Sequence, residues 1–235
     1  MESRKSRLDR FISVHTGINR RDVRLLIAQK RILINSEPAT DINQVIGQFD
    51  QISLDDELLQ NNQPIYIMMH KPVGVVSATV DEQHKTVLDL LDCDNKEQLH
   101  IVGRLDLNTS GLLLLTNNGE WSRNLTSPEH KVAKRYHVTL ENPITDDYAP
   151  AFAAGMYFPF EDITTQPAEL VKTGEREAQV SLTEGKYHQI KRMFGRFRNP
   201  VIGLHREAIG GLELDCGLAP GESRELTMEE VELLS

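Results

Sequence analysis

Gly103-Arg104-Leu105-Asp106-Leu107-Asn108-Thr109-Ser110-Gly111, followed by four leucines at 112–115, is the stretch of this 235-residue chain that decides its fold. The unbroken leucine run is typical of a strand buried on both faces. Turn-forming residues at 108–111 place Asp106 where a strand breaks open. On an extended backbone Arg104 would point the same way as Asp106. A carboxylate beside a guanidinium stays ionised and can act as a nucleophile, although an aspartate that only hydrogen-bonds its own turn is the commoner case.

The composition is that of an ordinary globular protein. Hydrophobic residues make up 39% and charged residues 26% of the chain, which allows one or two domains with a real core. We expect no targeting or membrane-spanning segment, because no apolar run is long enough. Cys93 and Cys216 lack metal-ligand spacing, so they predict reduced thiols in a cytoplasmic protein and no metal site.

The charge is distributed unevenly along the chain. The net charge is −9, yet nine basic residues and only two acids lie between Arg4 and Arg31, whereas residues 222–235 are acidic. An RNA partner is therefore compatible with the overall negative charge.

The first sixty residues predict a small helix–helix–strand module. Apolar residues at positions 8, 11 and 12 have helical spacing, and Gly17 can end that helix. Asn19 is a good N-cap for a second helix ending near Lys30, followed by short strands at 31–35, 42–46 and 51–54. Three cations lie off the apolar face of the second helix, where they are either solvated or contact phosphates: Arg20, Arg21 and Arg24.

The remainder predicts a larger α+β domain. The polar segment 59–64 ends in Pro64 and reads as a linker, which gives a module at 1–60, a linker at 61–64 and a domain at 65–235. Strands are expected at 65–69, 101–105, 111–116, 136–141, 178–183, 201–206 and 212–214, and helices at 86–91, 121–125, 146–154 and 187–198. A capping box at Thr227 and Glu230 opens a last short helix. We therefore predict a small N-terminal α/β module and a larger domain built on a mixed, mainly antiparallel sheet with flanking helices.

A basic helix is expected in the run from Glu184 to Phe194. It carries Lys186, Lys191 and Arg192, and no acid lies between Lys186 and Arg198. Either this helix packs on the core with a basic exterior, or its cations reach an RNA backbone and one of them pairs with a buried carboxylate.

Tyr136 shares a predicted strand face with Val138 and Leu140, which is compatible with core packing. Lys134 and Arg135 directly precede it, and such basic surroundings favour stacking on an extruded base. The chain contains no Walker loop, GxGxxG, HExxH or GxSxG motif, which disfavours nucleotide hydrolysis, dinucleotide binding, and zincin or α/β-hydrolase chemistry.

Taken in order, the segments Lys71–Gly74, Gly103–Gly111, Lys134–Tyr136 and Glu184–Met193 resemble those of the A subfamily of ribosomal small-subunit pseudouridine synthases. The resemblance runs almost end to end. It implies an RNA-binding domain of ribosomal-protein-S-four type at 1–60 and a catalytic domain at 65–235. It further implies isomerisation of a uridine in structured RNA without a metal or an organic cofactor, by a protein that we expect to be a monomer with no membrane contact.

The resemblance also assigns roles to residues. Asp106 matches the catalytic carboxylate, and Lys191 matches the basic residue that pairs with it. Tyr136 matches the aromatic that stacks on the target base and is expected to help remove its C5 proton. Whether Asp106 attacks the sugar or acts as a base on it stays open, as does the role of His70, which stands where the family usually has Asn. The remaining candidates are expected to support the site or bind RNA: Arg104, Lys71, Arg20, Arg21, Arg24, Lys134, Arg135, Lys186 and Arg192.

The expected substrate is small-subunit ribosomal RNA in an assembly intermediate. A large-subunit ribosomal RNA synthase of the same family and a non-catalytic RNA-binding ribosome-assembly protein are the alternatives. A glycoside or nucleoside hydrolase is a weaker one, because such enzymes normally use two carboxylates and the matched motifs supply only Asp106.

Overall fold

The computed structural model describes residues 5–234, which divide into two compact units between Pro64 and Ile65. Arg4, the first of the basic residues near the N-terminus, lies outside the described residues. The two units are described separately.

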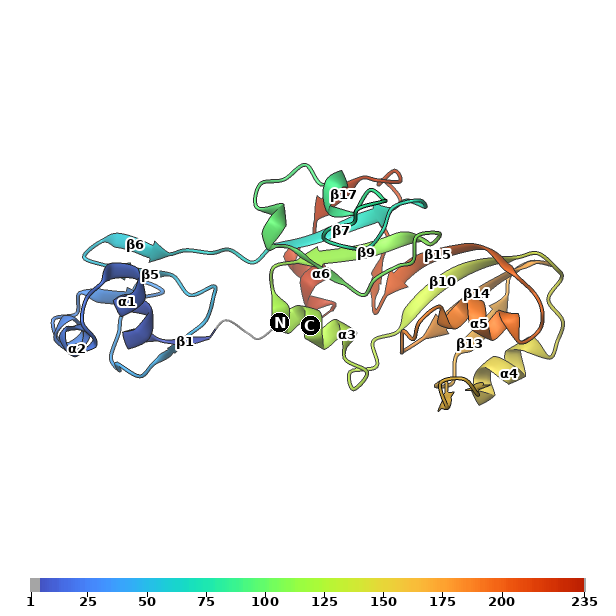
Figure 1. Cartoon of the computed structure of the whole chain (residues 1–235), viewed down its shortest axis with the longest axis horizontal. Coiled ribbons are helices and arrows are strands. Elements are labelled where there is room, and N and C mark those ends of the chain that lie inside the picture. The colour runs from blue at the N-terminus through green and yellow to red at the C-terminus, as the bar shows by residue number, and fades with distance from the viewer. Residues whose placement is uncertain (1–4, 235) are drawn as a thin grey trace. The chain divides into compact units, whose positions relative to one another are not determined.

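The first unit packs two helices against short strands (Figure 1). Helix α1 (Leu8–Thr16) ends at Gly17 in a left-handed conformation, and helix α2 (Arg20–Ala28) begins after Asn19, whose side chain accepts a hydrogen bond from the backbone of Arg21. Both predicted helix boundary signals are confirmed. The strands are β1 (Ser6–Arg7), β2 (Ile32–Ile34), β3 (Glu37–Pro38), β4 (Val45–Ile46), β5 (Ile52–Leu54) and β6 (Glu57–Gln60). They form a β1–β4 pair and a sheet in the order β3-β2-β5-β6.

Two predictions for this unit need correction. The strand expected at 42–46 is only β4, because the backbone amide of Gln44 bonds the carbonyl of Asp41 in a turn. The segment 59–64 was expected to be a linker, but its first two residues belong to β6. Gln60 pairs with Ile52, and the side-chain amide of Gln60 donates to two backbone carbonyls of the loop at 47–50.

The second unit is built on a nine-stranded sheet in the order β13-β14-β10-β15-β9-β7-β17, with β16 paired to β15 and β8 to β9. Among the strands that the structure describes in this sheet, only β9 and β15 run parallel, which confirms the mixed, mainly antiparallel sheet with flanking helices. Its strands are β7 (Tyr66–Lys71), β8 (His100–Val102), β9 (Ser110–Thr116), β10 (Lys134–Leu140), β13 (Glu169–Lys172), β14 (Glu177–Leu182), β15 (Val201–Ile209), β16 (Leu212–Glu213) and β17 (Ser223–Glu225). A separate hairpin comprises β11 (Tyr157–Phe158) and β12 (Ile163–Thr164). The helices of this unit are α3 (Gly119–Thr126), α4 (Tyr148–Ala154), α5 (Gln189–Gly195) and α6 (Met228–Glu232). Two 3-10 turns are η1 (Leu88–Leu90) and η2 (Lys96–Gln98).

Strand β9 is buried on both faces, as the leucine run predicts. Leu113 and Leu115 join the core that contains α4 and α5, whereas Leu112 and Leu114 join a second core under α3 and α6. In Figure 1 α4 and α5 lie against the β10–β14–β13 part of the sheet, away from α3 and α6.

Several predicted elements are shorter than expected. The strand at 101–105 ends at Val102, because the backbone amide and carbonyl of Leu105 bond the Ser77 hydroxyl instead of a neighbouring strand. The helix at 187–198 is confined to α5, since His188 is left-handed, and the helix at 86–91 is the 3-10 turn η1. Strands β11, β12, β13 and β17, which have two to four residues each, were not predicted from the sequence.

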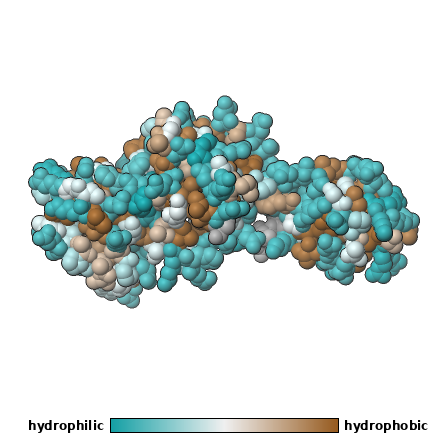
Figure 2. Space-filling model, turned by 180° about the vertical axis from the view of Figure 1, so that it is seen from behind, coloured by the Kyte–Doolittle hydropathy of each residue, from teal (hydrophilic) through white to brown (hydrophobic). Residues whose placement is uncertain are grey.

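The capping box at the last helix is confirmed, with Thr227 and Glu230 bonding each other's backbone amides. On the face that Figure 2 shows, hydrophilic residues dominate and hydrophobic residues form small separate patches. None of the helices in the part of the chain that the structure describes is long and apolar enough to cross a membrane.

Candidate active site

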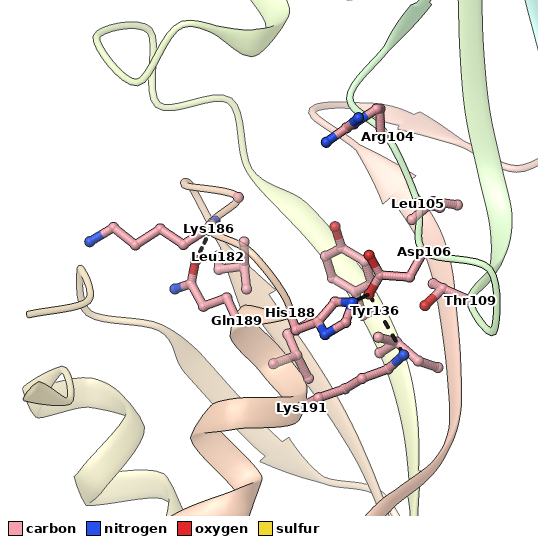
Figure 3. A pocket seen from close by; sticks show the side chains of 13 residues that line it. Arg104, Leu105, Asp106, Thr109, Tyr136, Leu182, Lys186, His188, Gln189 and Lys191 are labelled. Atoms are coloured by element: carbon pink, nitrogen blue, oxygen red, sulfur yellow. Dashed lines mark hydrogen bonds and ion pairs between the residues drawn. The ribbon is translucent and has the colours of Figure 1, made fainter. Parts of the chain in front are cut away.

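One cavity of the second unit gathers the main candidate residues of the sequence motifs. It is lined by residues 104–106 and Thr109 of the loop before β9, by Tyr136 on β10, by Leu182 and Leu204, and by residues 185–186 and 188–191 around the start of α5 (Figure 3). Asp106, Tyr136 and Lys191, distant in the sequence, therefore lie together. Asp106 is the only acid among the described residues that line this cavity.

The loop that carries Asp106 is held by a buried lysine. Lys71, fully buried at the end of β7, donates hydrogen bonds from Nζ to the backbone carbonyls of Pro72, Asp106 and Thr109. Burial lowers the pKa of Lys71 to about 8, against the opposing effect of the Asp106 charge. Of the two roles expected for Lys71, this geometry provides the supporting one, since the side chain has no surface through which to contact RNA.

Gly111 fixes how closely the loop approaches the sheet. Here β9 and β15 pair in parallel, with Gly111 opposite Arg206. Gly111 has a φ of +110°, and a Cβ atom there would lie 2.2 Å from the backbone oxygen of Arg206. A side chain at this position would push the two strands apart and displace the loop between β8 and β9.

The Asp106 carboxylate has two basic neighbours, both on the same oxygen. Lys191 Nζ lies 3.6 Å and His188 Nε2 3.4 Å from Asp106 Oδ2 (Figure 3). The pairing of Lys191 with Asp106 that the resemblance implied is thus present in the geometry. His188 was not predicted as a site residue, although its position three residues before Lys191, at the start of a predicted helix, was a usable signal.

Tyr136 projects into the cavity from the buried face of β10, and its ring lies beside Asp106 in Figure 3. Behind the ring is Arg206, which is 1% exposed and whose guanidinium carbon lies 6.0 Å from the ring centre. Arg206 donates to the carbonyls of Gly103 and Leu112, which flank the loop that carries Asp106. Arg206 was not predicted either, because a single arginine inside a predicted strand carries no local signal of burial.

Arg104 lines the cavity but makes no ion pair with Asp106 among the described contacts. Arg104 and Asp106 face the same cavity, although the backbone between them is not part of a strand: β8 ends at Val102, and the amide of Thr109 bonds the Asp106 carbonyl in a turn.

The other cations expected near the site lie in different surroundings. Lys134 is buried and donates to the Val132 carbonyl, and Arg135 pairs with Glu207 and Glu213. Lys186 lines the cavity, but its Nζ lies 3.3 Å from Glu184, and Arg192 pairs with Glu161 while covering the Phe158 ring. In the first unit Arg21 and Arg24 are exposed on α2, whereas Arg20 Nε lies 3.6 Å from Asp9.

A second hollow lies on the opposite face of the sheet, where Arg135, His205 and His70 contribute. Its polar groups mainly bond one another: Gln179 and Arg135 share Glu207, and His70 bonds the Leu218 carbonyl. His70 therefore lies outside the Asp106 cavity. No group of three or more potential metal ligands is found among the residues that the structure describes.

The chain is similar to known proteins over nearly its whole length. A family model described as RNA pseudouridylate synthase matches residues 65–195. The ribosomal small subunit pseudouridine synthase A of Pseudomonas aeruginosa is 49% identical over 226 residues, which cover 96% of this chain and 98% of that protein. The protein of the same name from Escherichia coli is 42% identical over the same coverage of both chains, 96% and 98%. A crystal structure of a pseudouridylate synthase is 39% identical, with a TM-score of 0.72 over 97% of this chain and 99% of that one.

Proposed function

The chain belongs to the RNA pseudouridylate synthase family, and we propose that its substrate is a uridine of small-subunit ribosomal RNA. The activity of the family is an isomerisation. The bond between N1 of uracil and C1′ of ribose breaks, a bond between C5 and C1′ forms, and the base loses a proton at C5 and gains one at N1.

The observation that carries this assignment is the environment of Asp106. The carboxylate is the only acid of its cavity among the described residues, and two basic side chains approach one of its oxygens. Breaking a glycosidic bond requires an ionised carboxylate beside the sugar, either to attack C1′ or to remove a proton from C2′. Lys191 lies close enough to pair with this carboxylate, so the arrangement supports Asp106 as the catalytic carboxylate by either route.

Tyr136 supplies the surface on which the base is held. A uridine in structured RNA must leave its stack before its C1′ can reach a carboxylate. The ring of Tyr136, backed by Arg206, offers a flat face beside Asp106 on which an extruded uracil can stack. We assign Lys191 to hold the charge of Asp106, and Arg104 at the rim to the RNA backbone.

The choice of RNA rests on the relatives. The proteins from Pseudomonas aeruginosa and Escherichia coli, at 49% and 42% identity, are both named for the small ribosomal subunit. The exposed Arg21 and Arg24 of α2 give the first unit a positively charged helix face, and we assign this unit to RNA binding. We further propose that the protein acts as a monomer in the cytoplasm, on RNA whose uridine is accessible during ribosome assembly.

The test is to map pseudouridines in both ribosomal RNAs from cells that lack the gene. Complementation with the wild type restores one pseudouridine in small-subunit RNA, Asp106→Asn does not, and Asp94→Asn, at an exposed position, restores it as the wild type does. Restoration by Asp106→Asn would show that the carboxylate is not catalytic. A pseudouridine restored only in large-subunit RNA would refute the substrate, and free uracil as the product would identify a hydrolase.

A further inference from the structure

His188 lies at the reacting carboxylate through an unusual backbone conformation. Its φ of +47° is in the left-handed region, which a residue with a Cβ atom adopts at a cost. The turn is fixed by Gln189, whose side chain accepts from the Lys186 amide and donates to Glu184. Strain of this kind persists where the surrounding structure imposes it, and here it directs the His188 ring into the cavity.

The ring of His188 is also held from its other side. Tyr187 stacks on it, with ring centres 3.9 Å apart and planes inclined by 19°. The orientation of the imidazole, with Nε2 toward Asp106, is therefore set before any substrate binds.

The two contacts on Asp106 leave its oxygens unequal. Lys191 Nζ and His188 Nε2 both approach Oδ2, from different directions (Figure 3). No hydrogen bond or ion pair to Oδ1 occurs among the contacts of the described residues. An ammonium on a flexible four-carbon chain does not fix the plane of a carboxylate, whereas a second donor from another direction does.

We propose that His188 is a positioning residue for Asp106: it holds Oδ2 together with Lys191 and leaves Oδ1 to face the ribose. The inference rests on the proposed function of Asp106 and goes beyond it by naming the reacting oxygen. A displacement of a reacting group by about 1 Å can lower the rate by about a hundredfold, so a fixed carboxylate plane matters for turnover.

Two substitutions of similar size test this. The amide nitrogen of His188→Gln can take the place of Nε2, whereas His188→Leu has no donor, and both side chains, unbranched at Cβ, meet the same left-handed backbone. We expect His188→Leu to lower kcat about tenfold or more, with KM and the urea midpoint unchanged. His188→Gln should retain most of the wild-type kcat. The assay is tritium release from RNA that contains 5-tritiated uridine. His137→Gln, on the opposite face of β10 beside Glu177, is the matched control and retains wild-type kcat.

Equal kcat values for His188→Leu and His188→Gln would overturn the inference. A change in KM with kcat unchanged would also overturn it, because it would indicate that His188 contacts the RNA directly. A readout independent of turnover is the nitrogen-15 resonance of His188 Nε2. This resonance shifts in Asp106→Asn if His188 Nε2 contacts the Asp106 carboxylate. A resonance that does not shift would overturn the inference. Failure of the wild type to release tritium from any RNA would refute the proposed function and leave this resonance test in force.

Discussion

Lys71 Nζ lies 3.1 Å from the backbone carbonyl oxygen of Asp106, so a fully buried lysine holds the chain at the residue whose carboxylate we propose to be catalytic. The same nitrogen donates to Thr109 at 2.8 Å and to Pro72 at 2.9 Å. A charged lysine without solvent is unfavourable, and burial accordingly lowers its pKa to about 8. The loop is thus ordered by an interaction whose strength depends on pH.

The first prediction concerns Lys71→Met. In the wild type the pKa rises from about 8 to 10.5 on unfolding, so between these pH values the unfolded chain binds more protons and the free energy of unfolding increases with pH. The variant lacks this group and is less stable at pH 7, because three carbonyls lose their donor. The free energy of unfolding of the wild type should therefore exceed that of the variant by an amount that grows by up to about 3 kcal/mol between about pH 7 and 10.5.

Urea unfolding measures this, followed by the fluorescence of Trp121, which is the single tryptophan and lies in the second unit. Lys85→Met, at an exposed position, is the control, and its difference from the wild type stays constant with pH. A constant difference for Lys71→Met as well would contradict a depressed pKa.

The same region shows what the sequence can and cannot predict. The leucines at 112–115 carry a local signal, because a run without alternation is compatible only with burial on both faces, and β9 confirms it. The early end of β8 at Val102 carries no such signal, since it depends on Ser77, which is distant in the sequence. The fold class therefore follows from local patterns, whereas the partner of a given side chain does not.

His188 and Arg206 were missed for the same reason. His188 reaches Asp106 through a positive φ that Gln189 and Glu184 impose, and no propensity of a histidine predicts it. Arg206 is buried because β15 passes against Gly111, a contact that exists only once the sheet has formed. Both residues complete a site whose first members were visible in the sequence motifs.

Removal of the Thr109 hydroxyl should stabilise the folded protein. The residue is 2% exposed, and its Oγ1 is buried without a hydrogen-bond partner in the part of the chain that is described. A buried hydroxyl without a partner costs about 1–3 kcal/mol, and valine has nearly the same shape. We expect Thr109→Val to raise the free energy of unfolding by about 1 kcal/mol, measured with urea and Trp121 fluorescence.

Thr116→Val is the matched control, because Thr116 is also fully buried but its hydroxyl donates to the Ile65 carbonyl and accepts from the Asn118 amide. We expect Thr116→Val to lower the free energy of unfolding by about 1–2 kcal/mol. Equal losses for the two variants would show that Thr109 has a partner after all.

Tyr136→Phe separates the ring from the hydroxyl. The ring keeps its packing on β10, so binding of RNA and the urea midpoint should be unchanged. We expect kcat to fall about tenfold or more, because the phenol is then missing as a group that can exchange protons with the base. Tritium release and RNA affinity are the two measurements, with Tyr136→Leu as the variant that also loses stacking and weakens binding. Wild-type kcat in Tyr136→Phe would reduce the role of this residue to stacking alone.

Reversal of charge on α2 tests whether the first unit binds RNA. Arg21 and Arg24 are exposed, and Arg20 is left in place because its Nε lies 3.6 Å from the buried Asp9. Each phosphate contact contributes about 0.7–0.9 to the slope of log affinity against log salt concentration, so the double variant Arg21→Glu and Arg24→Glu should lower that slope by about 1.5. Titration of ribosomal RNA at several salt concentrations measures it. The charge-preserving pair Arg21→Lys and Arg24→Lys retains the wild-type slope, and both double variants retain kcat on a short RNA that only the second unit contacts. A wild-type slope in the Glu variant would show that these side chains are merely solvated.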